Sequence, residues 1–110
     1  MCVDLGFFGV LFFLLFGHAL ADFALQGNFL VQAKNQHTDV GKTIWPWALF
    51  AHSMIHAGFV ALVTGSVWVG VAELAIHAFI DYRKCDSKLS FKQDQQLHIL
   101  CKVVWALVVT

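Results

Sequence analysis

The sequence predicts an all-α fold, in the form of a polytopic membrane protein built as an antiparallel four-helix transmembrane bundle. Of its 110 residues, 59% are hydrophobic and only 13% are charged, whereas soluble domains carry about 25% charged residues. The apolar residues are gathered into long blocks, which is typical of transmembrane helices. Together with a mean hydropathy of +0.72, this distribution favours a lipid environment for the chain.

Four apolar blocks are the candidate helices, and each approaches the ~20 residues that a helix needs to cross the hydrocarbon of a bilayer. The turn at 64–66 is too short for anything but a tight reversal, so the second and third helices form an antiparallel hairpin. Such a bundle leaves no room for a second domain, and we expect a single one. The expected spans are about 5–26, 44–63, 66–82 and 91–109.

The first block has a competing interpretation as a cleaved signal peptide, because Ala19-Leu20-Ala21 resembles a signal-peptidase site. The residues before the block contain no Lys or Arg and instead include Asp4, which is the wrong charge for a signal peptide. We therefore expect the first block to be a true membrane span.

Basic residues are concentrated in the first and third connections, and the 64–66 turn has none. The positive-inside rule then places both charged connections in the cytoplasm and both termini outside. Residues 27–43 mix apolar and polar side chains and could include a short interfacial helix. A formal net charge of +0 gives no indication of nucleic-acid binding. The basic residues of the connections are Lys34, Lys42, Arg83, Lys84, Lys88 and Lys92.

Each expected helix carries two metal-binding side chains at i,i+4 spacing. Such residues stack on one helix face, about 6 Å apart along the axis, so both can reach one ion or two neighbouring ions. The same spacing occurs in His-x-x-x-His zinc sites on helices. The candidate metal ligands are His18 and Asp22, His52 and His56, His77 and Asp81, and Asp94 and His98.

The order of these pairs follows the direction of the helices. His precedes Asp on the first and third helices, whereas Asp precedes His on the fourth, which runs the opposite way. This reversal puts the three aspartates in an outer layer and the matching histidines in a deeper one. One turn deeper still, Glu73 and Lys102 would each be an isolated charge in hydrocarbon, at a cost of about 2.5–3.5 kcal/mol or more. We expect them to form an ion pair, which either orients a ligand or only locks the bundle.

Four motifs, HALADFALQ, HSMIHA, HAFIDYRK and DQQLH, resemble in order and spacing those of a family of small bacterial and phage membrane proteins, the domain-of-unknown-function family 3307. They extend from His18 to His98 and so cover nearly the whole chain. The resemblance implies a four-span protein of the bacterial inner (plasma) membrane, without an established activity. The positions carried over are His18, Asp22, Gln26, His52, His56, His77, Asp81, Lys84, Asp94, Gln95 and His98.

Five histidines and three aspartates at one depth are too many for a single four-coordinate ion and suit two divalent ions that share bridging carboxylates. Imidazole and carboxylate without thiolate favour Zn, Fe or Mn over Cu(I) or an iron–sulfur cluster. Two alternatives stay open: a hydrogen-bonded polar network without metal, and haem or another pigment, which would leave the aspartates unexplained. The sixth histidine, His37, lies in a polar loop and is expected to be solvated.

Three polar residues border the expected site at the water boundary. Gln26 and Gln95 could hydrogen-bond to the ligating carboxylates. Lys84 could hold an anionic group, or it could extend to the lipid headgroups. Glu73, Lys102 and these three residues are the expected outer shell of the site.

Two classes of function follow from such a site. In the first, a metal-dependent hydrolase activates water against a lipid or phosphoester substrate, and an oxidative di-iron enzyme belongs to the same class. In the second, the polar or metal core stabilises a non-catalytic membrane subunit or scaffold, which associates with itself or with a larger complex. Metal transport is disfavoured, because 5–17 and 57–63 contain no polar side chain to line a path. An open coordination position facing water would indicate the enzyme, and a closed site the structural module.

Overall fold

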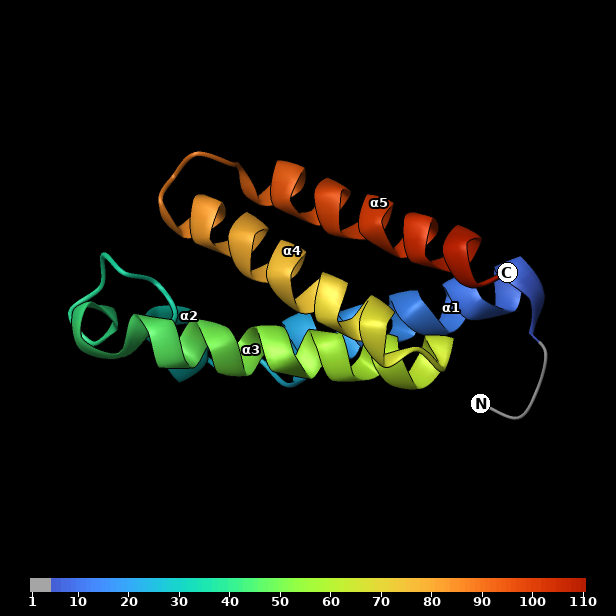
Figure 1. The fold of residues 1–110 in the computed structure, drawn as a ribbon. Coiled ribbons are helices and arrows are strands. Elements are labelled where there is room, and N and C mark those ends of the chain that lie inside the picture. Colours follow the sequence, from blue (N-terminus) through green and yellow to red (C-terminus); the bar gives the residue numbers. More distant parts are fainter. Residues whose placement is uncertain (1–4) are drawn as a thin grey trace.

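The computed structural model describes residues 5–110, and no strand occurs in that part of the chain, which confirms the all-α fold class (Figure 1). Asp4, whose negative charge argued against a signal peptide, lies outside the described residues. The elements are α1 (Gly6–Ala19), the π-helical segment η1 (Leu20–Ala24), α2 (Asn28–Ala33), α3 (Gly41–Thr64), α4 (Val67–Cys85) and α5 (Phe91–Val109).

The four long helices run side by side in an elongated molecule of 46 × 23 × 23 Å (Figure 1). α3 and α4 form the most extensive helix pair, and the turn between them reverses the chain as expected. Gly65 makes this turn with a φ of +70°, a left-handed conformation that glycine adopts without steric penalty. The Ser66 side chain then accepts a hydrogen bond from the backbone N–H of Val69 and caps α4.

Each expected span overlaps a long helix, but within residues 5–110 only two helical stretches, Gly6–Ala24 and α3, are long and apolar enough to be candidate membrane spans by composition. The first of these is not one continuous α-helix. α1 ends at Ala19 and passes into η1, where the N–H of Leu25 donates to the carbonyl of Leu20, five residues earlier, at 2.8 Å. The short α2 falls within residues 27–43, where the sequence allowed a short interfacial helix.

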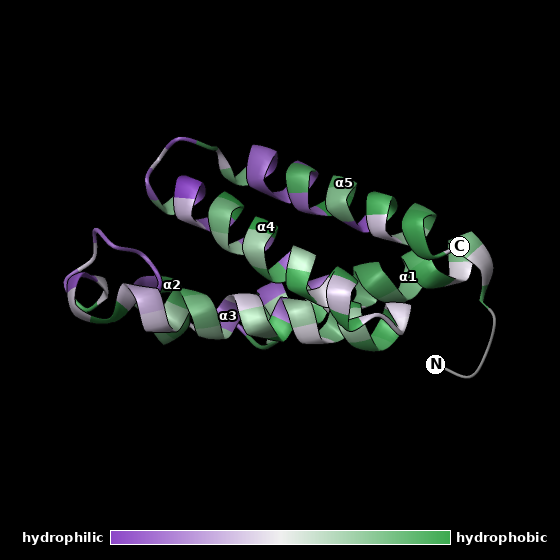
Figure 2. Cartoon of the chain, viewed as in Figure 1, coloured by the Kyte–Doolittle hydropathy of each residue, from purple (hydrophilic) through white to green (hydrophobic). Residues whose placement is uncertain are grey.

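The two long connections share one end of the bundle. α2 and the α4–α5 connection lie there, while the α3–α4 turn and the C-terminus lie at the other end (Figure 1). Hydrophilic residues colour the connections at the α2 end (Figure 2). Both connections that carry the basic residues therefore lie at one end of the bundle.

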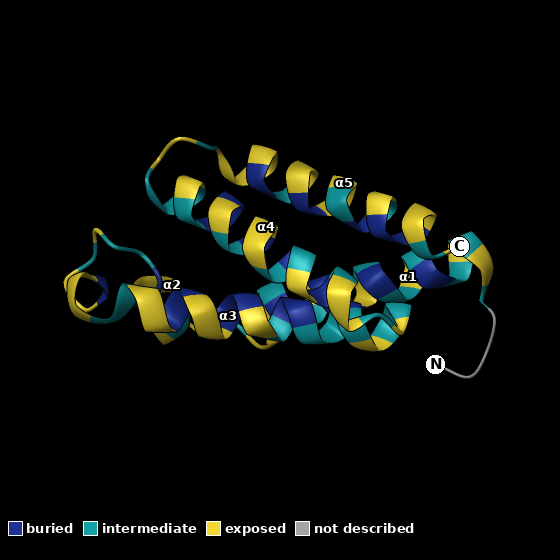
Figure 3. Cartoon of the chain, in the orientation of Figure 1, coloured by how far each residue is buried: buried dark blue, intermediate teal, exposed yellow. Residues whose placement is uncertain are grey.

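The interior of the bundle changes character along its length. Among the described residues, eleven polar or charged side chains are buried, as many as the buried hydrophobic ones. Buried residues face inward and exposed residues face outward along the helices (Figure 3), and the outward faces carry large apolar side chains. The apolar core lies toward the α3–α4 turn and consists of Val10, Leu14, Val60, Trp105 and Ala106.

Candidate metal centre

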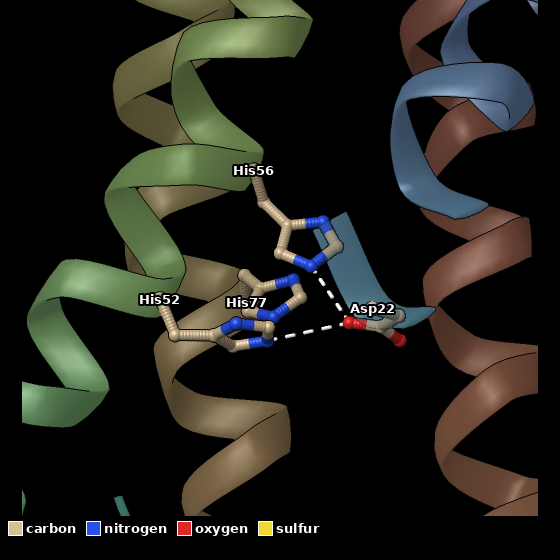
Figure 4. Close-up of side chains that lie close together, drawn as sticks. All are labelled: Asp22, His52, His56 and His77. Carbon is tan, nitrogen blue, oxygen red and sulfur yellow. Dashed lines mark hydrogen bonds and ion pairs between the residues drawn. The ribbon is translucent and has the colours of Figure 1, made fainter. Parts of the chain in front are cut away.

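Polar side chains from α1, η1, α3, α4 and α5 meet in the interior on the α2 side of the apolar core. The i,i+4 spacing places His52 and His56 together on the buried face of α3, and His77 on the buried face of α4. η1 supplies Asp22, whose carboxylate points at the two α3 imidazoles (Figure 4). A π turn widens a helix locally and is frequent at functional sites.

Four residues form a group of potential ligands, in which one ligand atom from each lies within 4.8 Å of the others (Figure 4). Oδ1 of Asp22 accepts a hydrogen bond from Nε2 of His56 at 2.7 Å and lies 3.3 Å from Nε2 of His52. Two donor atoms that bind one zinc ion at about 2.0–2.1 Å with a tetrahedral angle are themselves about 3.3 Å apart. A modest contraction would therefore let the group hold one ion. The four residues are Asp22, His52, His56 and His77.

Buried nitrogen atoms without hydrogen-bond partners mark this four-residue group. Both ring nitrogens of His52 lack a partner, as do Nε2 of His77 and Nδ1 of His56. These three imidazoles are at most 1% exposed, and buried polar atoms are rarely left unsatisfied. Because the lone pair of a neutral imidazole is a common metal ligand, the group has the chemistry of a metal site.

Glu73 orients His77 from one turn deeper in the bundle. Its Oε2 accepts a hydrogen bond from Nδ1 of His77 at 3.1 Å, which leaves Nε2 for a metal in the manner of carboxylate–histidine–metal arrangements. Nζ of Lys102 donates to both Glu73 oxygens at 3.1 Å, so the expected Glu73–Lys102 ion pair is confirmed. Nε1 of Trp105 also donates to Glu73, at 2.8 Å. The sequence did not predict this contact, because an indole in an apolar run has the pattern of a core residue.

A second group of potential ligands consists of Glu73, His77 and His98, and it shares His77 with the first. The His77 ring stacks between those of His56 and His98, with centroids 3.8 and 4.1 Å away. A cation placed in the second group would be repelled by the ammonium of Lys102, which is 3.1 Å from Glu73. The first group is therefore the better site for an ion.

Two expected ligands, His18 and Asp94, lie outside both groups. Nε2 of His18 donates to Oε1 of Gln95 at 2.9 Å. Oδ1 of Asp94 accepts a hydrogen bond from Nε2 of His98 at 3.2 Å. Both residues extend the polar interior toward α5, next to the four-residue group and outside it.

Asp81 is the third expected ligand outside both groups, and a lysine holds it. Nζ of Lys34, a residue only 3% exposed, donates to Oδ2 of Asp81 at 2.7 Å. The sequence indicated Lys34 only as one of the loop charges. No pattern around it signals burial, because its partner lies 47 positions away on another helix.

The three residues that were expected to border the site make different kinds of contact. Nε2 of Gln95 donates to the Asp22 carboxylate at 2.8 Å, as expected. Gln26 does not bind a carboxylate: it donates to the backbone carbonyl of Asp22 at 3.0 Å, because the helix ends here and its last carbonyls need other donors. Lys84 lies over the ring of Phe91, 5.3 Å from its centroid, and so turns toward an exposed aromatic residue.

His37 lies outside the bundle, as expected, with 59% of its side chain exposed. Its Nε2 donates to Oδ1 of Asp86 at 2.8 Å and joins the two long connections. This hydrogen bond lowers the pKa of the Asp86 carboxyl. The pair is a surface contact, separate from the four-residue group.

The four-residue group is closed to solvent. The Asp22 side chain is the most exposed of the four, at 8%, and an apolar groove between α3 and α4 is lined by other residues, such as Met54, Gly58 and Val71. Four protein ligands in closed surroundings are typical of structural zinc sites, whereas catalytic sites keep a position open.

Comparison with known proteins places the chain in a family without an assigned activity. The family model described as "Protein of unknown function (DUF3307)" matches residues 10–110. No curated protein and no solved structure matches the chain significantly. The matched range contains every residue of the four-residue group and both of its buried lysine neighbours, Lys34 and Lys102. The chain therefore belongs to the domain-of-unknown-function family 3307.

Proposed function

We propose that the protein is a single four-span domain of the bacterial inner membrane that binds one divalent metal ion through Asp22, His52, His56 and His77. In this proposal the two basic connections face the cytoplasm, both termini lie outside, and the metal is near the cytoplasmic surface. The single observation that carries the proposal is the group of three buried imidazoles around the Asp22 carboxylate, in which Nε2 of His52 and Nε2 of His77 have no hydrogen-bond partner.

The distribution of polarity supports the membrane assignment. Large apolar side chains cover the outside of the bundle, with Phe8 at 81% and Trp68 at 82% exposure, while charged groups are buried inside. α4 and α5 fall short of the composition of a membrane span because they carry charged residues. The charges within their central turns, Glu73 and Lys102, are paired and only 1% exposed. In those central turns the outward-facing residues of α4 and α5 are apolar, which is what a bilayer requires.

The charge balance supports one divalent ion. Around the site, the described residues include four buried or nearly buried carboxylates and two buried ammonium groups, of Lys34 and Lys102. With neutral imidazoles this leaves two uncompensated negative charges, which are costly in a low-dielectric interior. One divalent ion brings the balance to zero. The carboxylates are Asp22, Glu73, Asp81 and Asp94.

Three imidazoles and one carboxylate suit Zn²⁺ in tetrahedral coordination. The ion would replace the proton that His56 now shares with Asp22, since metal binding displaces protons from its ligands. With four protein ligands and closed surroundings, the ion stabilises the bundle. The protein then acts as a non-catalytic membrane module that associates with itself or with a larger complex.

A metal-dependent hydrolase is the second candidate, and the position of Asp22 favours it. Asp22 is the most exposed of the four ligands and lies on the π-helical segment just before a loop. If η1 moved, a water molecule could replace Asp22 as a ligand of the ion and attack a lipid headgroup or another phosphoester. A second ion, in the group that contains His98, would belong to this alternative.

Elemental analysis of the protein purified in detergent tests the proposal. We expect about one equivalent of zinc per chain in the wild type. The His52→Ala/His77→Ala variant should contain none while staying helical by circular dichroism. The matched control is His37→Ala, which removes an exposed histidine outside the group and should keep the metal.

Each result has a defined consequence. No metal in the wild type, under conditions without chelators, would overturn the proposal in favour of a hydrogen-bonded polar network. Two equivalents would favour the dinuclear alternative. Hydrolysis of a phosphodiester by the wild type, absent from the double variant, would establish the enzyme over the structural module.

A further inference from the structure

The carboxylate of Asp81 lies beside the four-residue group, which is the proposed metal-binding group, and it forms an ion pair with a lysine. Lys34 lies at the end of α2, and its ammonium is 2.7 Å from Oδ2 of Asp81, with both side chains at most 4% exposed. Asp81 lies one helical turn from His77 on α4. A buried ion pair between a connecting segment and a helix is expensive to form. This cost indicates that the pair does more than hold the two segments together.

The same Asp81 oxygen faces the unpartnered nitrogens of the metal-binding group. Oδ2 is 3.6 Å from Nε2 of His52 and 4.0 Å from Nε2 of His77, and neither nitrogen has a hydrogen-bond partner. Ligand atoms that share one ion are about 3.3 Å apart. Asp81 is therefore close to the position of a fifth ligand.

We propose that Lys34 determines the coordination number of the metal, because its ammonium keeps Asp81 out of the coordination sphere. This inference rests on the proposed metal site and adds a residue that sets its specificity. With Lys34 present, the ion has three nitrogen ligands and one oxygen ligand, a set that suits four-coordinate zinc. Without Lys34, Asp81 turns from the ammonium to the ion as a second carboxylate.

The choice of metal follows from this competition. A second carboxylate raises the coordination number and the share of oxygen ligands, which moves the preference toward Mn and Fe. A neutral residue at position 34 also removes a positive charge that repels the ion. Lys34 is thus a positioning residue that keeps the site selective for zinc, and Lys34→Met should relax that selectivity.

Cobalt(II) is the probe for this test, because its visible absorption is far stronger in four-coordinate than in five- or six-coordinate sites. The wild-type protein in detergent, loaded with Co²⁺, should show the strong bands of a four-coordinate ion. Lys34→Met should bind Co²⁺ with bands several-fold weaker, and it should retain relatively more Mn²⁺ in competition with Zn²⁺. Lys34→Met/Asp81→Asn is the matched control, since it lacks the fifth ligand, and should regain the strong bands.

The outcomes separate this inference from the metal site itself. No Co²⁺ binding by the wild type would overturn the proposed site. Strong bands in both the wild type and Lys34→Met, or weak bands in the wild type, would overturn only the role of Lys34. Should Lys34→Met fail to fold, Lys34→Gln carries the same expectation, because its uncharged amide holds Asp81 less strongly than a metal does. If neither variant folds with Co²⁺ present, the ion does not replace the ammonium and the inference is wrong.

Discussion

The two halves of this bundle use the same four helices but opposite chemistry. Toward the α3–α4 turn, Leu14 and Val60 belong to an apolar core that needs only volume and shape. Toward α2, the interior also contains imidazoles, carboxylates and two buried ammonium groups, most of which have a specific polar partner. The apolar half can tolerate gradual change, whereas the polar half loses a complete interaction when one partner is removed.

Trp105 stands at the boundary between the halves. Its ring is part of the apolar core, while its indole N–H donates to Glu73 at 2.8 Å. Glu73 in turn binds Lys102 and His77. The apolar half therefore positions the deepest carboxylate of the polar half, and through it an imidazole of the four-residue group.

The largest effect on the free energy of unfolding is expected from removing one partner of the Glu73–Lys102 pair. Lys102→Met leaves a carboxylate uncompensated in the interior, and it should lower the free energy of unfolding by about 3–5 kcal/mol. Unfolding of the protein in detergent micelles, followed by circular dichroism, measures this change. Glu73→Gln/Lys102→Met removes both charges and should recover most of the loss. Equal losses in the single and double variants would mean that the polar half does not depend on charge pairing.

A cavity in the apolar half should have a smaller effect that does not depend on metal. Leu14→Ala truncates a side chain that is 2% exposed, and it should lower the free energy of unfolding by about 3 kcal/mol. The change should be the same with zinc and with a chelator, because the substitution touches no ligand. Leu62→Ala is the control, since Leu62 is 73% exposed and its truncation should have little effect. A strong dependence on metal would contradict the separation of the two halves.

The smallest effect is expected outside both halves, at the His37–Asp86 pair. The hydrogen bond from His37 lowers the pKa of Asp86 below the ordinary value of about 3.9. Its contribution to stability is therefore present above about pH 4 and is lost as the pH falls through the lowered pKa. Asp86→Asn should remove this acid dependence and change little at neutral pH, because the pair is exposed and screened by solvent. Unfolding midpoints of wild type and variant across the acid range measure this effect. A variant with unchanged acid dependence would show that the pair does not contribute.

Sequence alone determined the features that depend on periodicity and on chain direction. Four apolar blocks predicted four long helices, and the i,i+4 spacing predicted which side chains share a helix face. Matching the depth of Glu73 and Lys102 was enough to pair them, because two lone charges in an apolar interior have few other partners. Gln95 was likewise expected to bind a carboxylate, and it does.

Only the tertiary structure decided which of the eight expected ligands converge. That outcome depends on the rotation of each helix about its axis and on the π turn that carries Asp22, neither of which a periodic pattern specifies. The Lys34–Asp81 contact depends on how the connection between α1 and α3 folds back over the bundle. Such long-range contacts arise from packing, whereas the helices and their faces arise from local spacing, and this difference explains what the sequence alone could not predict.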